Sequence, residues 1–325
     1  MKKPNQVVSV TVLTILAIML AIVTSNFTTA SVRIVFTICI PFAVIGMIST
    51  EKQAWLAFIA SVIALFSLTE VRYAVEVTIS FITPSILLGR FVDVVKDRDF
   101  EDRNEPLYMG IIIFILSTIA YFIIAKYLLN IDLLKQMIDL FNSSSKMRLE
   151  NMTKEQLELI GNITVTDMTN MMRNLLVSIL FIQSCICVFL SYYLGGLIAE
   201  NITDKSFRRI RMTEFYLPGN SVVITFVIYV LVYLASYMKL PINTIAIMSN
   251  LQLIFNILFM LQGISLTMYF IKTRIIQRKS SIIFPMIIII TLGMMGGVML
   301  LSILGMLDCI MDFRKIKTNS TKKSI

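Results

Sequence analysis

One apolar stretch of the sequence, residues 244–271, carries small and polar residues at regular spacing and no charge. They are Ser249, Gln252, Asn256, Gly263 and Thr267. At about 100° per residue, these positions fall on one arc of a helix. Because an amide in hydrocarbon is costly without a partner, the arc should face other helices or a wet cavity. We expect Ser249, Gln252 and Asn256 either to bind a substrate or to join helices to one another.

A second polar group stands between two apolar stretches and consists of Glu70, Arg72 and Glu76. The stretch that follows, residues 74–93, contains Pro84 and Gly89, so we expect a short helix broken there. A bent helix beside these charges would form a polar pocket at the outer face, with Arg72 and Glu76 as substrate-binding residues. The alternative is a turn at the membrane surface whose charged side chains reach water.

A third polar group, Asp308, Asp312 and Arg314, lies near the end of the chain. Two carboxylates four residues apart share a helix face. If Asp308 and Asp312 are buried together, one of them could carry a proton, because two neighbouring carboxylates do not readily ionise together. The alternative is structural: the carboxylates would pair with Arg314 or with the basic residues 272–279 and orient the final helix.

The residues that most catalytic and metal sites require are absent or poorly placed. The chain has no histidine, which excludes His-based acid–base catalysis, a Ser-His-Asp triad and His-ligated zinc. The four cysteines lie in or beside apolar runs, where free, buried thiols are expected. No phosphate-binding loop motif occurs, so the chain should not hydrolyse nucleotides. We therefore expect no enzyme activity, no cofactor and no metal.

Composition places the three polar groups on membrane helices. Hydrophobic residues make up 57% of the 325-residue chain and charged residues only 15%. We predict an all-α, polytopic integral membrane helix bundle, a single transmembrane domain over residues 1–325, with about nine spans (roughly eight to ten). The predicted spans cover residues 7–24, 32–49, 54–69, 74–93, 107–129, 174–198, 221–238, 244–271 and 281–311.

An extramembrane segment, residues 130–173, separates the fifth and sixth spans. Apolar spacing predicts an amphipathic helix over 131–141, and a capping box at Thr153 and Gln156 predicts a second one. Residues 142–145 should form the break between them. The segment could be a lid over a substrate site or a packed connector.

Lysine and arginine residues near the span ends favour a cytoplasmic N-terminus in the cell (plasma) membrane, with residues 130–173 outside. Nine crossings would then leave the basic tail, residues 315–325, outside, which contradicts the same rule. Two half-spans hinged at Gly293–Gly297 would return the tail to the cytoplasm, but each half is short for a crossing. Both topologies stay open.

Three motifs resemble the YybS-type membrane proteins of Gram-positive bacteria. They are FRRIRMTEFYLP at 207–218, LQGISLTMYFIKTR at the end of the stretch 244–271, and the closing SILGMLDCIMDFRK. The resemblance covers the whole chain in the order of its spans and implies a polytopic membrane protein without an established activity. This chain departs from the family at Phe215 or Tyr216, where the family tends to have tryptophan.

A more distant likeness is to the substrate-binding (S) components of energy-coupling-factor vitamin transporters. Ala17 and Ala21 match the AxxxA pair with which those components dock a membrane coupling subunit. TPSILLGRF at 83–91 is similar to a short helix near their substrate site. The likeness implies a substrate-binding membrane subunit, partnered by that coupling subunit and by ABC-type ATPases, although S components typically have only about six spans.

Three functions are compared, of which the third, a membrane enzyme, would need carboxylates such as Glu76, Asp308 or Asp312, and no recognised catalytic spacing is present. The first is transport or substrate binding by a membrane subunit. The second is a non-enzymatic regulatory or scaffolding protein that binds a partner or anionic lipid through its basic cytoplasmic loops, with Arg208, Arg209 and Arg211 as contact residues. The basic residues cluster beside the spans, so the net charge of +9 indicates membrane topology and not nucleic-acid binding.

Overall fold

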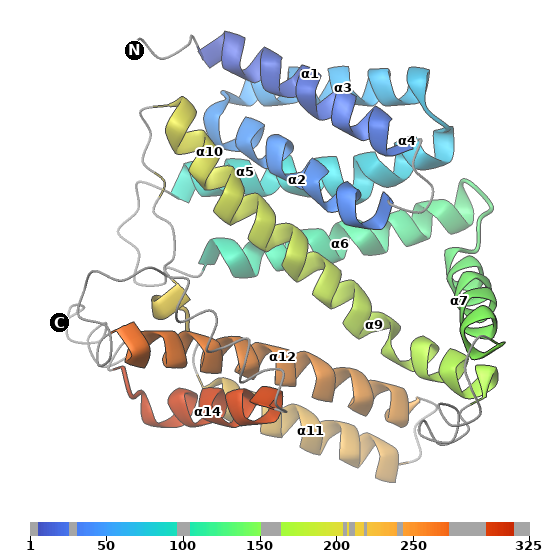
Figure 1. Cartoon of the computed structure of the whole chain (residues 1–325), viewed down its shortest axis with the longest axis vertical. Helices are drawn as coiled ribbons and strands as arrows, with labels where there is room; N and C mark the ends of the chain where they lie inside the picture. Colours follow the sequence, from blue (N-terminus) through green and yellow to red (C-terminus); the bar gives the residue numbers. More distant parts are fainter. Residues whose placement is uncertain are drawn as a thin grey trace. The chain divides into compact units, whose positions relative to one another are not determined.

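The chain is helical throughout the part that the structure describes. In the computed structural model, the described residues are 6–25, 31–95, 105–150, 164–203, 207, 212–217, 220–238, 243–272 and 297–314. These residues contain no β-strand, and six of their helices are long and apolar enough to cross a membrane (Figure 1). Shorter apolar helices accompany them. The predicted all-α, polytopic class is therefore confirmed.

The contacts within the chain gather in two compact units. Unit 1 comprises Met1–Arg173 and Ile179–Arg209, and unit 2 comprises Asn174–Ser178 and Ile210–Ile325. The sequence predicts one transmembrane domain over residues 1–325 and does not mark this division.

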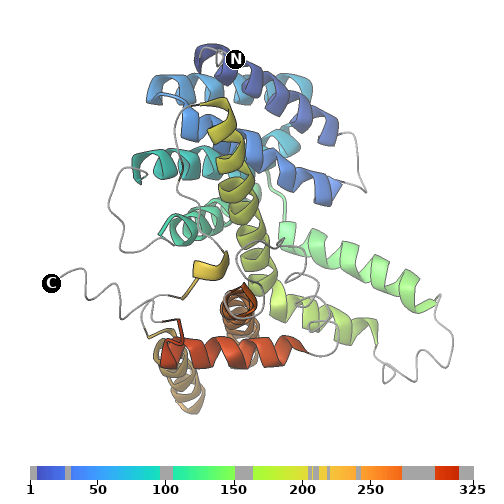
Figure 2. The ribbon, with the colours of Figure 1, turned by 60° about the vertical axis from the view of Figure 1, so that its left-hand side comes forward.

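Unit 1 is built around α2 (Ser31–Ile48), most of whose side chains from Ile38 onward are buried. Helices α1 (Gln6–Ser25) and α5 (Thr83–Val95) both pack against it (Figures 1 and 2). A helix enclosed by other helices needs no polar face, which explains its apolar sequence. The remaining elements of the unit are α3 (Glu51–Leu68), α4 (Val71–Val77), η1 (Thr78–Ile82), α6 (Glu105–Tyr127), α7 (Leu133–Glu150), α9 (Val165–Phe189), η2 (Leu190–Leu194) and α10 (Gly195–Ile202). Residues 174–178 of α9 belong to unit 2.

The fourth span differs from its prediction. Elements α4, η1 and α5 form one continuous helix over residues 71–95, so the expected break at Pro84 and Gly89 is wrong. The π-helical turn η1 ends at Ile82, two residues before Pro84, and its wider ring accommodates a residue that lacks an N–H group. In this turn the N–H and the hydroxyl of Thr83 both donate to the carbonyl oxygen of Thr78.

Gly89 permits close helix packing instead of breaking the helix. A Cβ atom on Gly89 would lie 2.2 Å from the carbonyl oxygen of Ala43 and 2.9 Å from the Cα atom of Gly46, both in α2. Helices approach this closely only where small residues meet. The glycine therefore belongs to the α2–α5 contact.

Two helices begin earlier than predicted because capping residues start them. Helix α3 begins at Glu51 instead of residue 54, and a capping box of Thr50 and Gln53 starts it. Helix α9 begins at Val165 instead of residue 174, after a capping box formed by Thr164 with Asp167. A polar capping residue can start a helix well before the apolar run that marks its membrane span.

The extramembrane segment is only partly described. Helix α7 runs through residues 142–145 without the predicted break. The predicted capping box at Thr153 and Gln156 lies outside the described residues.

Unit 2 holds the helices at the end of the chain. They are η3 (Met212–Glu214), α11 (Ser221–Tyr237), α12 (Thr244–Phe270) and α14 (Val298–Met311). The bounds of α11 and α12 match the spans predicted over 221–238 and 244–271. Of the predicted hinge at Gly293–Gly297, only Gly297 is described, and it precedes α14.

Helices α12 and α14 touch backbone to backbone at two glycines. A Cβ atom on Gly263 would lie 1.9 Å from the carbonyl oxygen of Leu301, and one on Gly305 would lie 1.9 Å from the carbonyl oxygen of Phe259. No real Cβ atom fits at such a distance. The contact therefore requires glycine on both helices.

We expect Gly263→Val and Gly305→Val each to lower the free energy of unfolding by at least about 1–3 kcal/mol, because the new side chain forces the two backbones apart. Thermal unfolding of the detergent-purified protein, followed by circular dichroism, measures the loss. Gly195→Ala is the matched control, since its Cβ would lie 3.6 Å from the nearest atom. A melting temperature for Gly263→Val equal to that of the wild type would contradict the close approach.

Candidate functional site

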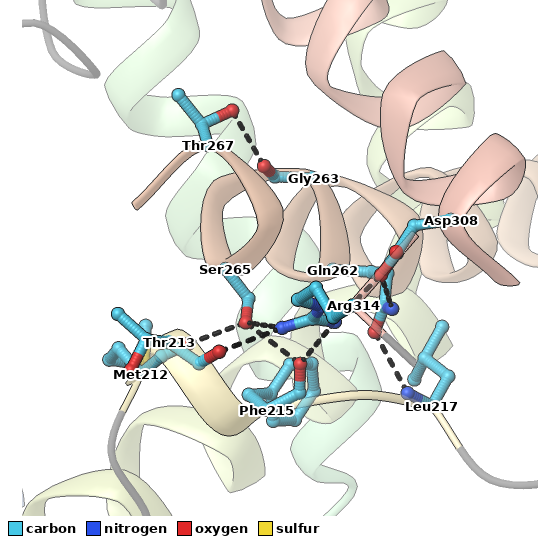
Figure 3. A network of polar contacts seen from close by, with 10 residues as sticks. All are labelled: Met212, Thr213, Phe215, Leu217, Gln262, Gly263, Ser265, Thr267, Asp308 and Arg314. Carbon is cyan, nitrogen blue, oxygen red and sulfur yellow. Dashed lines mark hydrogen bonds and ion pairs between the residues drawn. The ribbon is translucent and has the colours of Figure 1, made fainter. Parts of the chain in front are cut away.

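Three segments of unit 2 that lie far apart in the sequence meet in one polar network (Figure 3). We call it the Asp308–Arg314 cluster; it contains Met212, Thr213, Phe215, Leu217, Gln262, Ser265, Asp308 and Arg314. At its centre, Oδ2 of Asp308 accepts a hydrogen bond from Gln262 Nε2 and, at 2.7 Å, one from Arg314 Nη2. The cluster thus joins α12, the end of α14 and residues 212–217.

Arg314 holds the main chain of residues 212–217 against α12. Its guanidinium donates to the carbonyl oxygens of Thr213 at 3.0 Å and Phe215 at 2.9 Å, and to the Ser265 hydroxyl at 2.6 Å. The side-chain oxygen of Gln262 accepts from the N–H of Leu217 at 2.9 Å. Backbone groups without helical partners therefore find partners on side chains, as a buried segment requires.

The ion pair at the centre of the cluster is shielded from solvent. Only 1% of the Arg314 side chain and 2% of the Asp308 side chain are exposed. Among the described residues, Arg314 Nε and Asp308 Oδ1 have no hydrogen-bond partner. A buried pair of this kind is strongly destabilised when one member is removed, because the other charge stays buried. The geometry therefore favours the structural alternative for Asp308 and Arg314.

Asp312 has a different position from the predicted one. Helix α14 ends at Met311, and Asp312 follows in the left-handed region, with φ 45° and ψ 55°. Its N–H donates to the carbonyl oxygen of Asp308 at 2.9 Å. The expectation that Asp308 and Asp312 share a helix face is therefore wrong: Asp312 turns the chain so that Arg314 returns to the helix that carries Asp308.

The cluster also bears on where the described chain ends. Arg314 contacts residues 212–217, which directly follow the basic residues 205–211. The described end of the chain therefore lies next to residues 212–217. The side of the membrane on which both lie, and the topology of the basic tail, stay predictions.

Only part of the polar arc predicted on α12 packs against other residues of the described chain. Gly263 of the arc packs against α14, as an arc that faces other helices should. Gln252 and Asn256 are exposed, Ser249 is half-buried, and none of the three forms a side-chain hydrogen bond within the described part of the chain. Their predicted role in substrate binding stays a prediction.

Another amide residue of α12, Asn250, joins helical segments, and the sequence did not predict it. Asn250 is buried, and its side-chain oxygen accepts from the N–H and the hydroxyl of Ser178, one of the α9 residues that belong to unit 2, both at 2.8 Å. Its side-chain nitrogen donates to the carbonyl oxygens of Ala246 and Asn174. Asn250 lies outside the arc of Gln252 and Asn256, so helical spacing alone did not select it.

Unit 1 contains a second polar cluster, at the start of the helix over residues 71–95. The hydroxyl of Tyr121 in α6 donates to Glu76 Oε2 at 3.2 Å, and Arg72 donates to the side-chain oxygen of Gln136 in α7. Arg72 also lies close enough to interact electrostatically with Glu76 and Tyr121. We call these four residues the Arg72–Glu76 cluster. The structure thus brings both predicted residues of the outer pocket together with the extramembrane helix.

Ala17 and Ala21 lie inside unit 1. Both side chains are fully buried. The Tyr73 hydroxyl donates to the carbonyl oxygen of Ala21 at 2.8 Å and pairs with the Thr24 hydroxyl. The alanine pair therefore packs α1 within the unit in this structure, and its docking to a coupling subunit stays a prediction.

The remaining candidate residues cannot be placed in the same way. Arg208, Arg209 and Arg211 lie outside the described residues. Within the described ranges, no three His, Cys, Asp or Glu side chains gather as metal ligands would.

The sequence did contain a signal for the Asp308–Arg314 cluster. Its members fall in the three motifs that carry the YybS-type resemblance, namely residues 207–218, the LQGIS segment of α12 and the closing DCIMDFR. The predicted polar arc of residues 244–271 does not include Gln262 and Ser265, because the arc was chosen by helical spacing and not by membership of a motif.

We expect Asp308→Asn and Arg314→Gln each to lower the free energy of unfolding by about 3–5 kcal/mol, because each leaves one charge buried without its partner. Asp312→Asn is the control and should cost much less, since asparagine tolerates the left-handed conformation. Chemical denaturation of the protein in detergent compares the three variants. Equal stabilities for Asp308→Asn and Asp312→Asn would contradict the assignment of Asp308 as the buried partner.

Comparison with known proteins supports the membrane class. The sequence model of a family described as "Predicted membrane protein (DUF2232)" matches residues 13–309. Searches of the curated proteins and of the solved structures matched nothing. Since the match covers most of the chain and the structure is a set of apolar helices, the protein lies in a lipid bilayer and belongs to the DUF2232 family of predicted membrane proteins.

Proposed function

We propose that the protein is a substrate-binding membrane subunit that takes up a small molecule at the Arg72–Glu76 cluster. The observation that carries the proposal is the convergence of Arg72, Glu76, Tyr121 and Gln136 from three helices. Arg72 and Glu76 lie in the helix over 71–95, which is long and apolar enough to cross a membrane. Ionisable residues within a membrane span are costly, and they commonly mark a ligand or ion path. Unlike the Asp308–Arg314 cluster, this cluster has an exposed member, Arg72, from which a ligand can enter.

Helix α7 gives the proposed site a movable cover. It follows α6 after Asn130, and Gln136 in its first turns accepts the hydrogen bond from Arg72. A ligand that binds the Arg72 guanidinium in place of Gln136 would break this hydrogen bond. We therefore include in the proposal that residues 130–173 form a lid over the substrate site.

Two further features agree with a subunit of the S-component kind. Within the described residues, unit 1 contains five helices long and apolar enough to cross a membrane, namely α1, α3, the helix over 71–95, α6 and most of the helix over 165–202. The shorter apolar helix in α2 brings the number to six. This number agrees with the resemblance, and the later spans belong to unit 2. The proposed partners are a membrane coupling subunit and ABC-type ATPases, in the plasma membrane with the N-terminus in the cytoplasm.

A second candidate function is regulation or scaffolding through the basic cytoplasmic residues. The Asp308–Arg314 cluster favours it, because the cluster anchors residues 212–217 directly after Arg208, Arg209 and Arg211. An anchored basic segment could present its charges to anionic lipid or to a protein partner. Native purification in mild detergent separates the two functions: ATPases with a coupling subunit support transport, and signalling or envelope proteins support scaffolding.

The proposed site is tested by identifying the small molecules that co-purify with the full chain. We expect mass spectrometry of the denatured protein to find a bound compound in the wild type and to lose it in the double variant Arg72→Gln/Glu76→Gln. Gln252→Leu/Asn256→Leu is the matched control and should retain the compound. Loss in the control and retention in the first variant would move the site to α12 and overturn the proposal.

A further inference from the structure

We infer that the ligand of the Arg72–Glu76 cluster is a zwitterion, a group that carries a primary ammonium and an anionic oxygen a few bonds apart. The inference rests on the proposed function and specifies the chemical class of the ligand. It follows from how the two charges of the cluster are arranged and from what holds each of them.

The two charges lie one helical turn apart on the same face. Positions separated by four residues have Cβ atoms about 6 Å apart on a helix. Arg72 is exposed, whereas Glu76 is half-buried and lies further along the helix from its N-terminal end. The cluster therefore presents a donor group near the surface and an acceptor group beneath it.

Arg72 and Glu76 interact electrostatically but form no direct ion pair with each other. Among the described residues, neither of them takes part in an ion pair within 4.0 Å. Each is held by a neutral partner instead, Arg72 by the Gln136 amide and Glu76 by the Tyr121 hydroxyl. Both charges thus keep hydrogen-bonding capacity for a ligand, because a guanidinium has five N–H donors and a carboxylate has two acceptor oxygens.

A zwitterion is the class of ligand that satisfies both charges together. A simple anion would pair with Arg72 but bring a second negative charge near Glu76. A simple cation would pair with Glu76 but oppose Arg72. Because such repulsion is weakly screened beside a membrane span, either ligand should bind less well than a molecule that carries both charges.

Two sources supply this chemistry. One is a free α-amino acid, whose ammonium and carboxylate share one carbon atom. The other is the headgroup of phosphatidylethanolamine, which joins an ammonium to a phosphate. In both, the guanidinium would bind the anionic oxygens through paired hydrogen bonds and the Glu76 carboxylate would accept from the ammonium.

The test measures the melting temperature of the full chain in nanodiscs of phosphatidylcholine and phosphatidylglycerol. In the first arm, glycine, leucine, glutamate and lysine are titrated, and the most stabilising one is compared with its amine and carboxylic acid analogues. In the second arm, phosphatidylethanolamine replaces phosphatidylcholine, whose quaternary ammonium cannot donate a hydrogen bond. We expect stabilisation in one arm, and removal of either ligand charge should weaken apparent affinity about tenfold or more.

The variants assign each ligand charge to its residue. Arg72→Gln should bind the amino acid no better than the amine analogue, and Glu76→Gln no better than the acid analogue. In the lipid arm, either substitution should abolish the stabilisation by phosphatidylethanolamine. Glu70→Gln and Lys126→Gln are the controls, because they remove charges just before α4 and in the last turn of α6, outside the cluster, and they should behave as the wild type.

Stabilisation by only the amine, only the acid or an uncharged probe would overturn the inference, and so would the absence of stabilisation in both arms. These results would leave the proposed function intact if a co-purified compound still depended on Arg72 and Glu76. Loss of that dependence would instead remove the site itself.

Discussion

Hydrocarbon offers no water to replace a missing hydrogen bond, and the structure of this protein follows from that constraint. Helices satisfy the backbone, and hydroxyl groups on them turn back to their own helix: Thr14, Ser61 and Thr118 each donate to the carbonyl oxygen four residues earlier. Residues 212–217 have only a short helical turn, so their backbone needs partners from elsewhere. Arg314, Gln262 and Ser265 provide them.

The two polar clusters satisfy this need for hydrogen-bond partners in opposite ways. In the Asp308–Arg314 cluster, two charges pair at 2.7 Å and most of their remaining hydrogen-bonding groups face other residues of the unit. In the Arg72–Glu76 cluster, the charges are held by neutral groups, and Arg72 is exposed. A closed cluster holds segments in place, whereas charges that keep spare hydrogen-bonding capacity can exchange a partner for a ligand. This difference is why we assign structure to the first cluster and binding to the second.

Close helix contact in both units depends on glycine. Gly46 meets Gly89 in unit 1, and Gly263 lies near Gly305 in unit 2. Between helices in lipid, hydrophobic burial contributes little, so van der Waals contact and interhelical hydrogen bonds must hold them together. Gly263 and Gln262 are adjacent in α12, so one turn of this helix supplies both the close contact with α14 and a hydrogen bond to Asp308.

The sequence by itself determined the class of the protein and the bounds of its simplest spans. Long apolar runs can only be membrane helices, and α11 and α12 match their predicted ranges because apolar length decides both. The sequence also marked Arg72, Glu76, Asp308 and Arg314, because a charge beside an apolar run is conspicuous.

The sequence could not determine how these charges are paired. Pro84 predicted a break that the π turn avoids, and Asp312 left the face of Asp308 through a left-handed residue. Tertiary structure alone decided that Arg314 reaches Asp308, because the left-handed Asp312 turns the chain back. It also decided that Glu76 reaches Tyr121, because partners 45 residues apart are set by how helices pack and not by spacing along one helix.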